Sequence, residues 1–139
     1  MSKKIEFIDL GLPSGRLWAS ENAEGYYTYD EAKEKFGELL PEPEAFQELW
    51  EECQWLWDVK KKGMLVIGPN KNTIFLPALG YRDHNSGGLH FIGVCGYCWS
   101  CASFSQSNAR ILSFDSDSAD PLDIFNRRNG FSVHLCKEQ

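Results

Sequence analysis

The chain has 139 residues, enough for one domain with a single hydrophobic core and too few for two ordinary domains. Hydrophobic residues make up 42% and charged residues 24%, which excludes an intrinsically disordered chain, and no stretch reaches the roughly 20 apolar residues of a membrane span. The net charge of −6 argues against broad electrostatic binding to nucleic acid or to an acidic membrane. Glu6 and Asp9 interrupt the apolar run that a signal peptide needs after the N-terminal lysines. We therefore expect no export by that route and no membrane insertion.

The charges are unevenly distributed along the chain. Residues 1–62 contain fourteen acidic and eight basic residues, whereas residues 63–139 contain six of each. Between Asn72 and Cys136 there is no Lys, Glu or Met. Regions rich in strands and loops disfavour Lys and Glu, which is one explanation of this gap; a second follows from a family resemblance described below.

The first elements are predicted from local signals. Residues 5–19 indicate strand, turn and strand, because residues 11–15 carry Gly, Pro and Ser in a turn pattern. Thr28 and Glu31 have the spacing of a capping box, so a helix is predicted to begin there and to end near Gly37. A second helix is predicted after Pro43 from an apolar stripe at helical spacing.

The rest of the chain shows strand signals. Residues 64–67 and 73–76 flank a turn sequence and predict a hairpin. After Gly80 the pattern is irregular and predicts long loops, a short run at 97–100, and two strands near 110–115 and 131–136. The order predicts an α+β fold in one domain, 1–139, without internal repeats. The predicted core comprises Trp18, Phe36, Phe46, Leu49, Trp50, Ile74, Leu76, Trp99, Leu112, Phe114, Phe131 and Val133.

The cysteines form the strongest chemical pattern. Cys95, Cys98 and Cys101 have C-x2-C-x2-C spacing, with Cys53 and Cys136 elsewhere, and such spacing occurs in iron–sulfur and zinc ligation. No basic residue lies nearby to offset thiolate charge and no Pro follows the last cysteine. Five is an odd number, which is unfavourable for a disulfide framework. We expect no bound metal, no cofactor and free thiols.

Other titratable residues do not form a catalytic motif. His84, His90 and His134 are isolated in the sequence, and isolated histidines usually lie at the surface or are satisfied by neighbours. The chain lacks the nucleophile, metalloprotease and phosphate-loop motifs, so an enzyme is not expected. The acids Asp115, Asp117, Asp120 and Asp123 lack the glycine and terminal Glu of a calcium loop and are interpreted as solvated loop acids.

Several motifs resemble one known family over almost the whole chain. They are the segment 9–15 reading DLGLPSG followed by Leu17-Trp18-Ala19, the segment 68–78 reading GPNKNTIFLPA, Gly80-Tyr81-Arg82, Ser107-Asn108-Ala109 and Gly130-Phe131-Ser132-Val133. They resemble the Fibrobacter succinogenes major paralogous domain, common in gut Bacteroidetes and their phages. That family is similar to the C-type lectin fold of variable proteins made by diversity-generating retroelements. The resemblance implies a fixed scaffold that displays hypervariable residues to bind a ligand.

The chain also departs from these relatives. Leu39-Leu40-Pro41-Glu42 stands where the family has Trp-Arg before Pro-Thr. The calcium and sugar motifs of animal C-type lectins are absent, which speaks against calcium-dependent sugar binding. The formylglycine-generating enzyme, a fold relative, uses a reactive cysteine pair, but here the sequence places no basic partner to lower a thiol pKa.

The resemblance supplies the second explanation for the missing Lys and Glu. Such retroelements mutate template adenines, and an AAC codon can then become neither Lys, Glu, Met nor Trp. The resemblance assigns ligand binding to a variable region at about 94–129, at Cys98, Cys101, Phe104, Arg110, Ile111, Ser113, Asp115, Asp120, Leu122, Asp123, Ile124, Phe125, Arg128 and Asn129.

Strand alternation sharpens this expectation. If Leu112 and Phe114 point inward, Ile111, Ser113 and Asp115 point outward. We expect a protein or glycan on a cell surface as the ligand, reached through a phage tail or a surface display system, with homo-oligomers as a further option. The runner-up is a structural or assembly domain without an external ligand. The location stays open between a virion and the cytoplasm before assembly.

Overall fold

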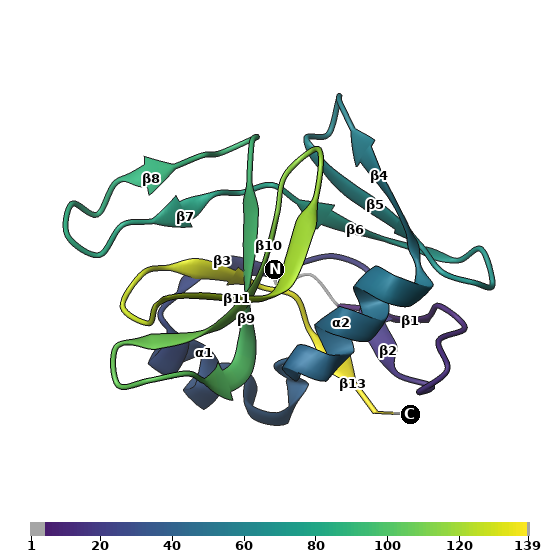
Figure 1. The fold of residues 1–139 in the computed structure, drawn as a ribbon, viewed down its shortest axis with the longest axis horizontal. Coiled ribbons are helices and arrows are strands. Elements are labelled where there is room, and N and C mark those ends of the chain that lie inside the picture. Colours follow the sequence, from purple (N-terminus) through teal and green to yellow (C-terminus); the bar gives the residue numbers. More distant parts are fainter. Residues whose placement is uncertain (1–4, 139) are drawn as a thin grey trace.

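A computed structural model describes residues 5–138, so the N-terminal lysines at 3 and 4 lie outside the described residues. The fold is α+β, with two helices beside several small sheets (Figure 1). The helices are α1 (Tyr29–Phe36), the 3-10 helix η1 (Gly37–Leu39) and α2 (Pro43–Glu52). The strands are β1 (Phe7–Asp9), β2 (Leu17–Ala19), β3 (Ala23–Tyr27), β4 (Gln54–Asp58), β5 (Gly63–Ile67), β6 (Thr73–Pro77), β7 (Tyr81–Arg82), β8 (Leu89–His90), β9 (Gly96–Ser103), β10 (Asn108–Phe114), β11 (Ala119–Asn126), β12 (Phe131–Val133) and β13 (Cys136–Lys137).

The two ends of the described chain meet in one sheet, in the order β1-β2-β13. Trp18 of β2 lies opposite Ile8 on one side and Cys136 on the other. The predicted hairpin at residues 5–19 is confirmed, and β13 pairs with its second strand.

The capping box predicted at α1 is confirmed. The Thr28 hydroxyl accepts from the Glu31 N–H at 3.2 Å, and the Glu31 carboxylate accepts from the Thr28 N–H at 2.8 Å. The helix ends at Gly37, whose φ of +49° is unfavourable for residues with a Cβ.

Helix α2 also forms as predicted, but the prediction that Trp50 is buried is wrong. Phe46 and Leu49 are fully buried, whereas Trp50 is 37% exposed. The Trp50 ring packs edge-on against Trp55, with centroids 5.2 Å apart. Strand β4, which carries Trp55, follows the helix directly and was not predicted, because no Gly or Pro separates the two elements.

The predicted hairpin at 64–76 is confirmed as β5 and β6, which together with β4 form a sheet in the order β4-β5-β6. The larger sheet has the order β11-β10-β9-β12-β3 and is antiparallel except between β9 and β12. Much of the region predicted as long loops is therefore strand. Asp120 and Asp123 lie in β11 and not in a loop.

Two hydrophobic cores lie on the two faces of the large sheet. The α2-side core contains Trp18, Phe46, Leu49, Ile74, Leu76, Cys98, Leu112 and Phe114, among others. The α1-side core contains Tyr29, Trp99, Ile111, Phe131 and Val133, among others, with Phe36 partly buried against it. Because β10 is an inner strand covered on both faces, the prediction that Ile111 points outward is wrong; its side chain is fully buried.

His134 lies in the segment between β12 and β13 and is fully buried. Its Nε2 is 2.6 Å from the Ala19 carbonyl and therefore donates to it, while Nδ1 is 2.6 Å from the Asn22 side chain. Burial lowers the pKa of His134 to about 4, so the ring is neutral in the folded protein at neutral pH.

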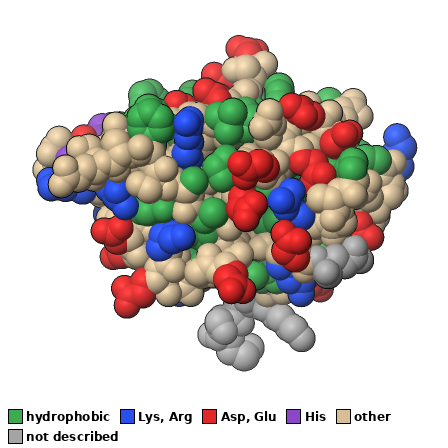
Figure 2. Space-filling model, turned by 60° about the horizontal axis from the view of Figure 1, so that its bottom comes forward, with side chains coloured by type: hydrophobic (Ala, Val, Ile, Leu, Met, Phe, Trp, Pro, Cys, Tyr) green, Lys and Arg blue, Asp and Glu red, His purple; other side chains and the backbone are tan. Residues whose placement is uncertain are grey.

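The surface over the helices mixes acidic and basic side chains (Figure 2).

Within the described residues, no helix has the length and apolar character needed to cross a membrane.

Candidate recognition surface

A cleft of about 220 Å³ lies among β9, β10 and β11, and five of the predicted ligand-binding residues line it. They are Ser113, Asp115, Asp120, Asp123 and Phe125. The fold thus brings together side chains that are up to twelve positions apart in the sequence, because β10 and β11 are antiparallel partners.

Hydrogen bonds fix the carboxylates around this cleft. Asp123 Oδ2 accepts from the Ser113 hydroxyl at 2.7 Å. Asp115 Oδ1 accepts from the N–H groups of residues 117 and 118 in the β10–β11 turn, and Asp120 Oδ1 accepts from the Leu122 N–H at 2.9 Å. None of the three carboxylates forms an ion pair with a described residue.

An aromatic cluster forms the floor of the cleft. Tyr97 and Phe125 line it, with ring centroids 5.6 Å apart, and the Tyr97 ring stacks on Phe131 at 5.3 Å. Burial, followed by a hydrogen bond with the Cys95 thiol, raises the pKa of Tyr97. The phenol therefore stays neutral, and the cleft combines a packed apolar floor with an acidic rim.

A second group of predicted residues forms an exposed strip beside the cleft. Phe104 is 51% and Leu122 41% exposed. The Arg110 guanidinium lies 4.8 Å from the centre of the Phe104 ring and donates to the Leu122 carbonyl at 2.7 Å. Aromatic and arginine side chains in contact are common at the energetic centres of protein interfaces. Ile124 is partly buried on the same strand.

Three of the predicted residues are buried and do not contribute to this surface. Cys98 is 1% exposed, in the α2-side core, and Ile111 is fully buried in the α1-side core. Asn129 is 7% exposed, and its Oδ1 accepts from the His84 N–H at 3.1 Å and lies 2.8 Å from His84 Nδ1. Asn129 thus ties the turn before β12 to the segment after β7.

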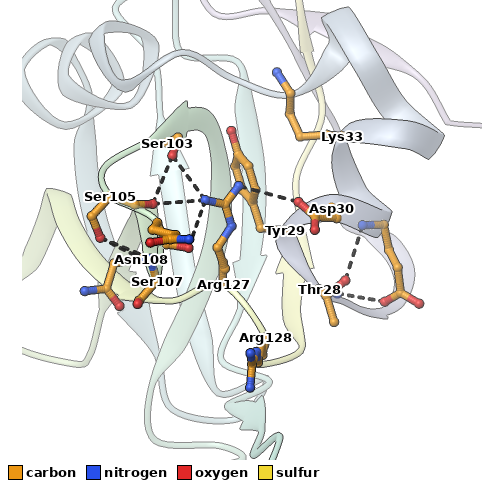
Figure 3. A network of polar contacts seen from close by, with 12 residues as sticks. Thr28, Tyr29, Asp30, Lys33, Ser103, Ser105, Ser107, Asn108, Arg127 and Arg128 are labelled. Atoms are coloured by element: carbon orange, nitrogen blue, oxygen red, sulfur yellow. Dashed lines mark hydrogen bonds and ion pairs between the residues drawn. The ribbon is translucent and has the colours of Figure 1, made fainter.

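Arg127 was not predicted as a site residue, yet it organises the hairpin loop 103–108 (Figure 3). Its guanidinium donates to the Ser105 carbonyl at 3.0 Å and to the Ser103 hydroxyl at 3.3 Å. The same group lies 4.7 Å from the Tyr29 ring centre and 3.5 Å from an Asp30 carboxylate oxygen. It thereby joins the loop that carries Phe104 to the start of α1.

Arg128 follows on the exposed side of this network and lines an open polar depression of about 670 Å³ with Thr28, Asp30 and Gln106. In the sequence, Arg127 stands three residues before Gly130-Phe131-Ser132-Val133, one of the motifs named above. Its bonding partners could not be read from the sequence because they come from three separate elements.

The cysteines of the C-x2-C-x2-C pattern do not converge. Strand alternation along β9 directs Cys98 into the α2-side core, whereas Cys95 and Cys101 pack against the α1-side core. Burial raises the pKa of Cys98 to about 12 and also raises that of Cys101. Cys101 lines a separate cavity of about 480 Å³, near Leu40 and Cys136. Within residues 5–138 no group of three His, Cys, Asp or Glu is placed to hold a metal ion.

Comparison with known proteins returned no matching family model, no matching curated protein and no matching solved structure.

Proposed function

We propose that this chain is a ligand-binding protein that recognises a protein or glycan on a cell surface through residues of about 94–129. One observation carries the proposal: five residues that the sequence resemblance selects line a single cleft among β9, β10 and β11. The adjoining strip of Phe104, Arg110 and Leu122 adds apolar area beside charge, a mixture suited to protein interfaces.

The scaffold we propose is the C-type lectin fold. Two helices beside small twisted sheets, with the first and last strands in one sheet, support it. The motif residues Trp18 and Phe131 are fully buried, as expected of positions that a diversified family must keep.

We further propose that the surface is diversified by a retroelement, in a phage tropism or surface display system. The exposed and partly buried positions of the predicted set tolerate substitution, because side chains there are supported by a packed sheet beneath them. Deep sequencing of the locus tests this directly. We expect an adjacent reverse transcriptase, a template repeat, and variation at the exposed positions; uniform low variation across 94–129 would overturn it.

Binding itself is tested with purified protein on a panel of bacterial cells and on a glycan array. Leu122→Asp is expected to abolish the signal, because it places a charge in the exposed strip. Leu89→Asp is the matched control, since Leu89 is 42% exposed and lies outside the surface. Equal loss in both variants, or binding unaffected by Leu122→Asp, would contradict the proposed surface.

The second candidate is a structural or assembly domain without an external ligand, for example a phage tail component. The burial of Cys98, Ile111 and Asn129 favours it, because positions expected to vary freely are here part of the packing. A locus without a retroelement, together with no signal on cells or glycans, would select this alternative.

A further inference from the structure

Strand β4 is the outer strand of the sheet β4-β5-β6, and within the described residues no strand pairs with its other edge. The hydrogen-bond alternation of this sheet shows what that edge presents. The Gly68 N–H donates to the Asn72 carbonyl, so the even-numbered residues of β5 bond to β6 and the odd-numbered ones bond to β4. Leu65 therefore exchanges hydrogen bonds with Leu56, its partner in register.

The residues on either side of Leu56 consequently direct their backbone groups away from β5. These are Trp55 and Trp57, whose N–H and C=O groups face the open edge. Their side chains pack against the α2-side core, whereas Leu56, on the opposite face, is 45% exposed.

This edge lacks the features that normally prevent strands from pairing between molecules. Such features are charged residues, Pro, bulges and irregular register. The first four residues of β4, Gln54 to Trp57, carry neither charge nor Pro, and the β4–β5 register runs without a shift. An open, uncharged and regular edge of four residues is suited to accept another strand.

The flanking charges identify which strand would fit. Glu51 and Glu52 precede β4, and Lys60, Lys61 and Lys62 follow it. None of these five side chains forms an ion pair with a described residue. When two such strands run antiparallel, the acidic end of each meets the basic end of the other, so the pattern is complementary to itself.

We propose that two copies of this chain pair through β4, antiparallel, about a two-fold axis at Leu56. In that register Trp55 of each copy lies opposite Trp57 of the other, which joins the outward backbone groups in hydrogen-bonded pairs. The two Leu56 side chains meet across the axis, and the two sheets become one sheet of six strands. A shift by two residues in either direction would move the axis to Trp55 or Trp57 and separate the two Leu56 side chains, so the central register is the one that brings them together.

The interface is isologous, since each copy contributes the same surface. It is small, so we expect a dissociation constant in the micromolar range. It lies outside residues 94–129 and does not depend on the proposed ligand-binding function.

Sedimentation equilibrium of the purified chain over a wide concentration range tests the dimer. We expect the apparent mass to rise from 15.9 kDa toward twice that value. Leu56→Lys places two lysines at the axis and is expected to weaken association by at least about tenfold, a change of about 1.4 kcal/mol. Val94→Lys, at a side chain of similar exposure, is the matched control and should leave the dimer intact.

A charge-exchange experiment tests the contact between the acidic and basic ends of β4. A variant with Glu51→Lys and Glu52→Lys carries lysines at both ends of β4, and one with Lys60→Glu, Lys61→Glu and Lys62→Glu carries glutamates at both ends. Each alone is expected to be monomeric, because like charges would meet. An equimolar mixture is expected to form a heterodimer, which also shows that both variants are folded.

A monomer at the highest concentration would overturn the proposal, as would a dimer insensitive to Leu56→Lys. A mixture of the two charge variants that stays monomeric would overturn the proposed contact between the acidic and basic ends of β4.

Discussion

Strands β4 and β11 are both outer strands of their sheets, yet their edges are built in opposite ways. β4 is uncharged over its central residues and regular in register. β11 contains Pro121 between Asp120 and Leu122, a second acid at Asp123, and a register shift against β10. Pro, charged residues and a register shift all discourage pairing with another strand. The outer edge of β11 is therefore unsuited to strand pairing and its side chains are available for contact, whereas β4 has backbone N–H and C=O groups available for pairing.

The difference separates two ways of making contact. A backbone edge recognises a partner strand through the spacing of its N–H and C=O groups, so only a few pairing registers fit it. The side chains on β11 can be substituted without changing the fold, so a surface of this kind can recognise different partners. A dimer through β4 would leave both β11 surfaces open and would bind a multivalent target with higher avidity than one copy.

The largest expected effect is on the free energy of unfolding, and it compares a buried residue of β10 with an exposed residue of β11. Ile111 on the inner strand β10 is fully buried, while Leu122 on β11 is 41% exposed. Ile111→Asp is expected to cost about 4 kcal/mol or more, because it buries an unpaired charge. Leu122→Asp should change stability by no more than about 0.5 kcal/mol. Urea unfolding measures both, and similar losses would show that Leu122 is also part of the packing.

A second prediction concerns His134, in the segment between β12 and β13. His134 has its pKa lowered from 6.5 to about 4 by burial, so the unfolded chain binds more protons between these values. The corresponding stability, about 3 kcal/mol, is present above pH 6.5 and is lost as the pH falls toward 4. Urea midpoints measured across this range should show the loss, and a His134→Gln variant should have a flatter profile in the same window.

Arg127 gives a smaller and more local effect. Arg127→Ala removes the contacts to loop 103–108, and we expect a local cost of about 1–2 kcal/mol. Amide hydrogen exchange in residues 103–108 should accelerate by about tenfold, with β4 amides unchanged. Arg127→Lys should recover only part of the protection, because an ammonium cannot reproduce the planar contacts of a guanidinium. Equal acceleration in β4 would instead indicate global destabilisation.

The smallest effect tests the edge of β11 itself. Pro121→Val together with Asp120→Thr removes two features that prevent pairing and should alter stability by about 0.5 kcal/mol or less. In a Leu56→Lys background, where β4 is blocked, we expect weak new self-association by sedimentation. Continued absence of association would show that Asp123 and the register shift alone protect this edge.

Much of the first half of the fold could be predicted from the sequence because its signals are local. The capping box of Thr28 and Glu31 and the turn between β5 and β6 each involve residues close in sequence. Strand β4 was missed because no Gly or Pro separates it from α2. β11 was missed because its Pro and acids are typical of loops.

The candidate site was only partly predictable for a related reason. Alternation along β10 correctly separates Leu112 from Ile111, but alternation cannot show that both faces of a strand are covered. The residues lining the cleft were identified through resemblance, whereas their hydrogen bonds depend on the β10–β11 register, which the sequence does not reveal. Arg127 joins three separate elements and could not be placed without the fold.

The three-stranded sheet β1-β2-β13 has a consequence for engineering. The Lys137 ammonium lies 4.5 Å from the centre of the Phe7 ring, so the chain enters and leaves the domain at neighbouring points. A domain with adjacent ends can be inserted into a surface loop of a carrier protein, or circularly permuted with a short linker, without stretching its core. This domain is therefore suited to insertion, as one unit, into the loop of another protein.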